Sequence, residues 1–161
     1  MNLARILIIA GSDSGGGAGI QADIKAVTAL GGYAMTAITA LTAQNTQGVE
    51  DVMPVPEAFI AAQMQAVLPD LGADCVKTGM LHSPEVIDTV AEGLEALASA
   101  VPLVVDPVMV AQSGDRLVSD AALHRLRERL IPRARLITPN IPEAEALLGQ
   151  TISDARDMPA A

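Results

Sequence analysis

The sequence predicts an α/β fold of three layers, α/β/α, built around a mostly parallel sheet. Short apolar stretches alternate with stretches of helical periodicity along the 161 residues. This alternation is typical of parallel strands joined by right-handed helical crossovers, with helices on both faces of the sheet. Tyr33 and Phe59 are the only aromatic residues. We therefore expect a core of Ala, Val, Ile, Leu and Met within one domain that spans residues 1–161.

The first unit is a buried strand that passes through glycines into a helix. Residues 6–9 are apolar and mostly β-branched, which indicates a strand covered on both faces. A helix is predicted from Ala18 to the pair Gly31-Gly32, which is placed to end it. The glycines of the turn permit positive φ and close approach of a ligand, and we expect the helix N-terminus to offer unpaired N–H groups. These glycines are Gly15, Gly16, Gly17 and Gly19.

The later elements follow from the same alternation. Strands are expected at residues 33–41, 49–55, 75–78, 101–105 and 136–138, the second of these as a short edge strand. Helices are expected at residues 56–67, after Ser83, after Ser119 and at 142–148. Phe59 is predicted on the inner face of the first of these helices. Arg125, Arg127 and Arg129 are predicted to face mostly water.

The last residues carry a helix-capping signal without a helix. Residues 151–154 resemble a helix start, but the sequence stops at Ala161 before an apolar face develops. We read this as a shortened chain, and an ordinary frayed terminus is the alternative.

Composition excludes several partners. Nineteen acidic residues against ten basic ones give a net charge of −9, with no basic cluster, so nucleic acid and anionic membranes are not expected partners. No apolar run is long enough to span a membrane. Cys75 is the one cysteine, which excludes an internal disulfide and a cysteine-built zinc site. We expect a cytoplasmic protein.

Polar residues follow the strands, where ligands bind in open α/β sheets. These positions are residues 11–13, 42–46, 78–80, 106–108 and 139–140. The glycine turn fits neither the dinucleotide-binding glycine pattern nor a Walker A loop. Amides at Gln44 and Asn45 indicate a ligand recognised by neutral hydrogen bonds. The alternative for the glycine turn is that it only allows helix and strand to pack closely.

Two acids indicate a magnesium site. Asp106 ends an apolar strand before a proline, and Glu143 lies in the first turn of a helix after Asn140. Together they resemble an outer-sphere or water-mediated Mg²⁺ site, because nucleotide-bound Mg²⁺ keeps several waters and takes few carboxylates. The alternatives are a turn-initiating Asp106 and a Glu143 that stabilises a helix N-terminus.

Four other side chains have plainer interpretations. Spacing alone favours an exposed position for Asp23 on its helix. Lys77, just before a strand end, is only slightly more indicative of a site residue than Lys25. Cys75 is expected in the core rather than as a nucleophile. His82 is expected in an exposed loop.

Five motifs in order resemble the ribokinase-like superfamily, and within it the hydroxymethylpyrimidine/phosphomethylpyrimidine kinases. The motifs are AGSDSGGGAGIQADIKA, TALTAQNTQGV, VKTGML, VVDPVM and ITPNIPEAEALLG. The resemblance implies ATP- and Mg²⁺-dependent phosphorylation of 4-amino-5-hydroxymethyl-2-methylpyrimidine and then of its monophosphate. It implies substrate contacts at Gln44, Gly11, Ala18, Asp23, Met80 and Val108. It also implies magnesium and phosphate-side residues at Asp106, Asn140 and Glu143, with Asp106 and Glu143 toward the metal.

The sequence departs from the family pattern at one place. The family's glycine-rich turn, which supplies the anion hole and the catalytic residue, is not found after Leu148. We therefore assign no catalytic residue here, and expect a C-terminally shortened kinase domain with weak pyrimidine binding and little or no turnover. The alternatives are a pyridoxal kinase-like enzyme and a non-catalytic pyrimidine-binding fragment, which an additional chain could complete. Because dimers are common in the family, a homodimer is possible.

Overall fold

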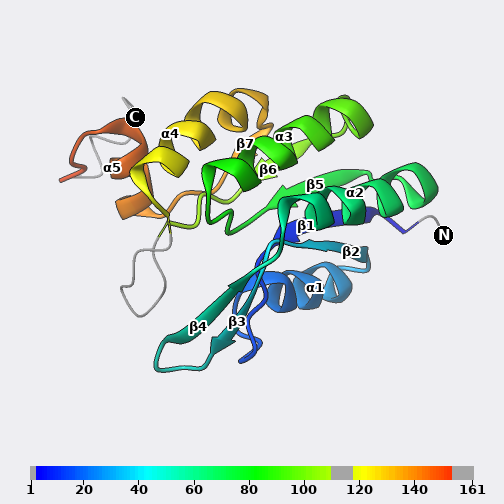
Figure 1. The fold of residues 1–161 in the computed structure, drawn as a ribbon, viewed down its shortest axis with the longest axis horizontal. Helices are drawn as coiled ribbons and strands as arrows, with labels where there is room; N and C mark the ends of the chain where they lie inside the picture. The colour runs from blue at the N-terminus through cyan, green and yellow to red at the C-terminus, as the bar shows by residue number, and fades with distance from the viewer. Residues whose placement is uncertain (1–2, 110–117, 154–161) are drawn as a thin grey trace.

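A computed structural model describes residues 3–109 and 118–153 and confirms the α/β class. Five strands form one parallel sheet in the order β2-β1-β5-β6-β7 (Figure 1). The strands of this sheet are β1 (Arg5–Ala10), β2 (Tyr33–Ile38), β5 (Cys75–Thr78), β6 (Leu103–Val105) and β7 (Leu136–Ile137). The helices are α1 (Gly19–Ala29), α2 (Glu57–Leu71), α3 (Pro84–Leu97), α4 (Asp120–Arg129) and α5 (Ile141–Leu148), with a 3₁₀ turn at Ile131–Arg133.

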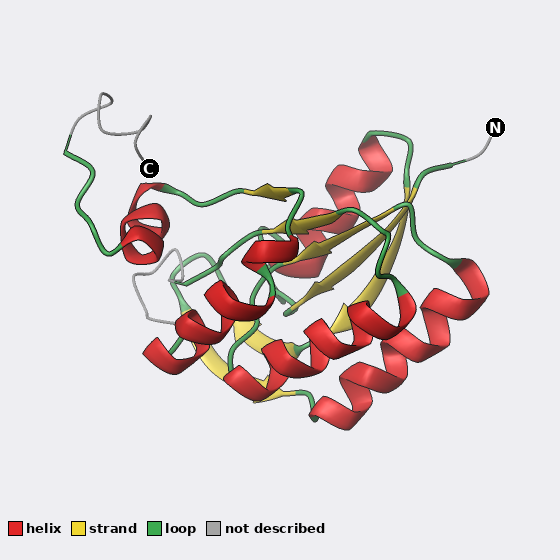
Figure 2. Ribbon diagram, turned by 90° about the horizontal axis from the view of Figure 1, so that it is seen from above, coloured by secondary structure: helices red, strands yellow, loops and turns green. Residues whose placement is uncertain are grey.

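The two faces of the sheet have separate cores. Helices α2, α3 and α4 lie side by side on one face, and α1 covers the other (Figures 1 and 2). In β1, Leu7 and Ile9 point into the larger core under the three helices. Ile8 and Ala10 point to the other face, where they meet Ile20 of α1. This alternation on a strand buried on both faces produces the three predicted layers.

The expected strand at residues 33–41 is wrong in its extent, because the chain leaves the sheet at Thr39. There β2 ends, and β3 (Ala40–Gln44) pairs antiparallel with β4 (Val49–Pro54) in a separate two-stranded sheet, the β3–β4 ribbon. The side chain of Gln63 on α2 bonds both the N–H and the carbonyl of Ile38, at 2.8 and 3.0 Å. The expected edge strand at residues 49–55 therefore belongs to the ribbon, not to the main sheet.

Helix α2 extends beyond the predicted end at residue 67. It continues to Leu71, and its buried residues are Ile60, Met64 and Leu68. Phe59, predicted on the inner face, is 62% exposed. The rest of the expected inner face is confirmed, because Ile60 and Met64 are buried and Val67 packs against the core.

Helices α3 and α4 begin where their capping serines predict, and α5 begins at Ile141, one residue before its expected start. Ser83 accepts a hydrogen bond from the N–H of Val86, and Ser119 accepts one from Ala122. The prediction that the arginines of α4 mostly face water is wrong for two of them. Their partners lie on α3: Arg125 pairs with Asp88 at 3.0 Å, and Arg129 pairs with Asp88 and Glu95. The two helices are thus joined by charges as well as by apolar packing.

Two other boundaries differ by one or two residues. Strand β6 begins at Leu103 rather than at residue 101, and β7 ends at Ile137. Residues 151–153 form no helix, and Asp154, the last residue of that expected helix start, lies outside the described residues.

Candidate functional site

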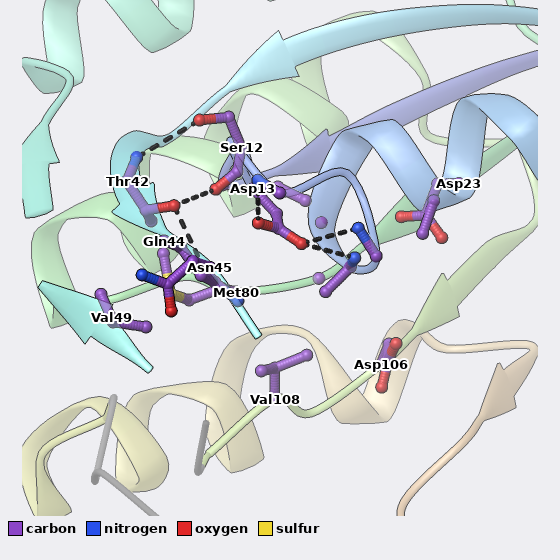
Figure 3. Close-up of a pocket in the computed structure, with 18 of the residues that line it drawn as sticks. Ser12, Asp13, Asp23, Thr42, Gln44, Asn45, Val49, Met80, Asp106 and Val108 are labelled. Atoms are coloured by element: carbon purple, nitrogen blue, oxygen red, sulfur yellow. Dashed lines mark hydrogen bonds between the residues drawn. The ribbon is translucent and has the colours of Figure 1, made fainter. Parts of the chain in front are cut away.

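A pocket lies beyond the carboxyl ends of β1, β5 and β6. Its volume is about 370 Å³, and the start of α1 and the β3–β4 ribbon complete its walls (Figure 3). Seven of the residues proposed for the site line it, from five different segments of the chain. They are Gly11, Ala18, Asp23, Gln44, Met80, Asp106 and Val108. Asn140 and Glu143 do not line this pocket.

The glycine turn is organised by Asp13, a residue that the sequence analysis included only as part of a strand end. Its carboxylate accepts hydrogen bonds from the N–H groups of Gly15, Gly17 and Ala18, each at 2.8 Å. The side chain is 5% exposed. The expectation of unpaired N–H groups is therefore wrong for Gly17 and Ala18, because the chain supplies its own anion. The signal was an aspartate just before the glycines, a common arrangement in turns.

These bonds also hold Asp13 ionised. Burial alone would raise the pKa of its carboxyl. The N–H groups of Ala18, Gly15 and Gly17 outweigh burial, so the pKa of Asp13 lies below its usual value. The N–H groups of Gly15, Gly17 and Ala18 already donate to the buried carboxylate of Asp13. These three groups are therefore not available to bind a phosphate.

Gly19 allows α1 to begin directly beneath β1. It has a φ of +54°, and a Cβ there would lie 2.5 Å from the carbonyl oxygen of Gly11. The N–H of Ile20 donates to that same oxygen at 3.0 Å. Only glycine fits this close approach of helix to strand, which is the packing role that the sequence analysis gave as the alternative for the turn.

The β3–β4 ribbon brings Gln44 to the pocket. The Ser14 hydroxyl donates to the carbonyl of Gln44 at 2.6 Å and accepts from its N–H at 2.7 Å. The Thr42 hydroxyl donates to the carbonyl of Ser12 and lies 3.2 Å from the side-chain oxygen of Gln44. The glycine turn thus fixes the ribbon, and Gln44 presents a neutral amide to the pocket, as its sequence position suggested.

The charged end of the pocket contains Lys77, Asp23 and Asp106. Lys77 Nζ lies 2.7 Å from Asp23 Oδ1 and 3.1 Å from Asp106 Oδ2. Burial disfavours its ammonium form, but the two carboxylates outweigh burial and raise the pKa of Lys77. The expectation of an exposed Asp23 is wrong, since its side chain is 18% exposed. Sequence reasoning missed this cluster because its members lie on α1, β5 and the segment after β6.

Asn140 and Glu143 form a capping box at α5. The Asn140 side chain accepts from the N–H of Glu143 at 2.9 Å, and Glu143 Oε2 accepts from the N–H of Asn140 at 3.0 Å. Glu143 Oε1 accepts from the N–H of Met109 at 3.3 Å, and the residue is 6% exposed. Both carboxylate oxygens are therefore engaged by backbone donors, which is the helix-terminal role given above as the alternative.

Cys75 and His82 do not line the pocket. Burial raises the pKa of the Cys75 thiol, which disfavours the thiolate that a nucleophile requires. His82 is half-buried rather than exposed, and burial lowers its pKa although Glu57 and Glu85 act in the opposite direction.

In the described residues, no group of three or more His, Cys, Asp or Glu side chains is placed to hold a metal ion. None of the described helices is long and apolar enough to cross a membrane.

Known proteins resemble this chain over its whole length. The thiamine biosynthesis bifunctional protein ThiED of Geobacter sulfurreducens is 54% identical over 95% of the chain, which covers 31% of that protein. The hydroxymethylpyrimidine/phosphomethylpyrimidine kinase of Mycobacterium tuberculosis is 48% identical over 100% of the chain, which covers 58% of that kinase. The chain thus spans less than two thirds of these curated relatives.

Solved structures agree with these relatives. The phosphomethylpyrimidine kinase of Clostridium difficile superposes with a TM-score of 0.89 at 48% identity, over 96% of this chain and 67% of that one. The pyridoxal kinase of Staphylococcus aureus in complex with pyridoxal superposes with a TM-score of 0.88 at 36% identity, over 99% and 57%. The family described as phosphomethylpyrimidine kinase matches residues 13–161. This chain therefore belongs to the phosphomethylpyrimidine kinase family.

Proposed function

We propose that this chain takes part in phosphoryl transfer from ATP to the hydroxymethyl group of 4-amino-5-hydroxymethyl-2-methylpyrimidine, and then to the monophosphate, in thiamine biosynthesis. One observation carries the proposal: a neutral amide, apolar side chains and acids from separate crossovers meet around one pocket. The volume of about 370 Å³ lies in the range of small-molecule sites.

The pocket has a neutral end and an acidic end. In Figure 3, Gln44 and Met80 lie on one side and Asp23 and Asp106 on the other. An amide both donates and accepts, which suits the edge of an aminopyrimidine, and Met80 adds an apolar wall. We place the ring at the neutral end and its hydroxymethyl group toward the acids.

We assign ATP and Mg²⁺ to the acidic end. A neighbouring structure, the pyridoxal kinase of Staphylococcus aureus, was solved with AMP-PCP and pyridoxal. The donor set fits a hydrated Mg²⁺ beside Asp106, which lines the pocket. Glu143 fits only through water, because both of its oxygens accept from backbone N–H groups. A bound Mg²⁺ would neutralise charge on the transferred phosphate.

The test is binding of 4-amino-5-hydroxymethyl-2-methylpyrimidine by calorimetry, followed by an ATP-consumption assay. We expect measurable binding, and at least a tenfold loss of affinity in Gln44→Ala, since a buried polar group of the ligand would lose its partner. The matched control is Gln47→Ala, an exposed amide on the same ribbon that does not line the pocket. Equal affinity in both variants and the wild type would contradict the proposal.

A pyridoxal kinase-like activity is the second candidate. It is favoured by the 36% identity to the Staphylococcus aureus pyridoxal kinase over 99% of this chain. The same calorimetry with pyridoxal separates the two candidates. We expect tighter binding of the aminopyrimidine, because Gln44 can both donate to and accept from its edge. Tighter binding of pyridoxal would reverse the order of the two proposals.

Location and assembly complete the proposal. We assign the protein to the cytoplasm, on the sequence grounds given above. A homodimer is proposed because Leu41, Val52 and Met53 of the β3–β4 ribbon are exposed, Met53 at 59%. Sedimentation equilibrium is the measurement, and a monomer at high concentration would argue against the dimer.

A further inference from the structure

Lys77 joins three parts of the fold that are distant in sequence. It lies on β5, between Ile8 of β1 and Val104 of β6 in the parallel register. Its neighbour Val76 belongs to the larger core, so Lys77 points to the opposite face, where α1 lies. From there its ammonium reaches Asp23 on α1 and Asp106 after β6.

The two carboxylates need a cation between them. Because both bond the same nitrogen, their oxygens lie within about 6 Å of each other, a distance at which like charges interact strongly. The side chains of Asp23, Lys77 and Asp106 are 18%, 25% and 28% exposed, so water screens this repulsion only partly. Without Lys77, mutual repulsion would turn the two carboxylates apart.

Asp23 has one engaged and one unengaged oxygen. Lys77 bonds Oδ1, whereas Oδ2 is buried and has no hydrogen-bond partner among the described residues. Since Asp23 lines the pocket, a ligand O–H or N–H is the natural donor to Oδ2. The orientation of Oδ2 depends on the ion pair that Lys77 forms with Oδ1 of the same carboxylate.

We propose that Lys77 is a positioning residue, which fixes Asp23 so that its second oxygen accepts a hydrogen bond from the bound pyrimidine. Lys77 also lines the pocket, and in this proposal its effect on binding passes through Asp23. This inference rests on the proposed function, because it needs the pyrimidine in the pocket. The competing reading is a structural ion pair that only ties α1 to the sheet.

A double-mutant cycle separates the two readings. Calorimetry measures the affinity of the full chain for 4-amino-5-hydroxymethyl-2-methylpyrimidine in the wild type, Lys77→Met, Asp23→Ala and the double variant. We expect each single substitution to weaken binding about tenfold, and the double variant to bind no more weakly than the weaker single variant. Lys77→Arg should recover most of the affinity, because its guanidinium can still bond both carboxylates.

Arg125→Met is the matched control, since it removes a partly exposed ion pair between two other elements, 3.0 Å from Asp88. It should lower stability and leave the affinity unchanged. If Lys77→Met does not fold, Lys77→Gln keeps a polar side chain without the charge and should show the same non-additive loss. Losses that multiply to about a hundredfold in the double variant would overturn the proposal, because Lys77 would then act independently of Asp23.

Unchanged affinity in a folded Lys77→Met variant would also overturn the proposal and leave the structural ion pair. Failure of the proposed function looks different, because the wild type itself would then not bind the pyrimidine.

Discussion

Asp13 shows how a single residue fixes the character of the pocket. Three backbone N–H groups converge on its buried carboxylate, in a turn that would otherwise resemble an anion site. The sequence indicated a ligand-binding turn at these glycines, but not which atoms the donors serve. Hydrogen bonds between a side chain and nearby backbone depend on the turn conformation, which residue types alone do not specify.

Asp13→Asn should lower the free energy of unfolding by about 1–3 kcal/mol at neutral pH, because the amide replaces a charged acceptor of three N–H donors. The pKa of Asp13 is lower in the folded chain than the unfolded value of 3.8. Its contribution is therefore complete above pH 3.8 and is lost as the pH falls through the folded value.

Urea unfolding of both proteins between pH 7 and pH 3 measures this difference. The exposed Asp70→Asn on α2 is the control and should change stability by less than about 0.5 kcal/mol. A difference between wild type and Asp13→Asn that grows toward acid pH would refute the assignment.

At the scale of elements, the starts of α3 and α4 were the most predictable features. Ser83 and Ser119 each cap the helix that follows, as their sequence positions indicate, whereas the cap formed by Asn140 was not predicted. The break at Thr39 was not predictable, because residues 33–44 contain no glycine or proline to mark it. At this point the side chain of Gln63, distant in sequence, bonds the N–H and the carbonyl of Ile38, a tertiary contact that no local pattern indicates.

Ser83→Ala should cost about 1 kcal/mol of stability, because the N–H of Val86 loses its acceptor at the start of α3. Ser99→Ala, an exposed serine beyond the other end of α3, should have almost no effect. Thermal unfolding of the three proteins measures both changes. Equal melting temperatures for Ser83→Ala and wild type would show that the cap does not contribute.

At the scale of the whole molecule, the strand order places the polar strand ends at one rim, as the fold class predicted. Seven proposed site residues therefore line one pocket. The sequence predicted that these residues meet at this rim, but not the distances between their side chains. Lys77 was missed for the complementary reason: its partners come from different crossovers, and only the folded sheet brings them within 3.1 Å.

We expect the described elements to unfold as one domain. Strand β1 contributes Leu7 and Ile9 to one core and Ile8 and Ala10 to the other, so neither core can persist when this strand leaves the sheet. Differential scanning calorimetry should give one transition, with equal calorimetric and van't Hoff enthalpies. Two separate transitions would instead indicate two domains.

Gln63 connects the helical layer with the start of the β3–β4 ribbon, whose Gln44 lines the pocket. The side-chain amide of Gln63 bonds the N–H and the carbonyl of Ile38, the last residue of β2, just before the chain enters the ribbon that carries Gln44. A substitution of Gln63 on α2 would remove both hydrogen bonds from the junction of β2 and the ribbon, and the ribbon reaches the pocket through Gln44. A residue outside the pocket can thus influence the position of one that lines it.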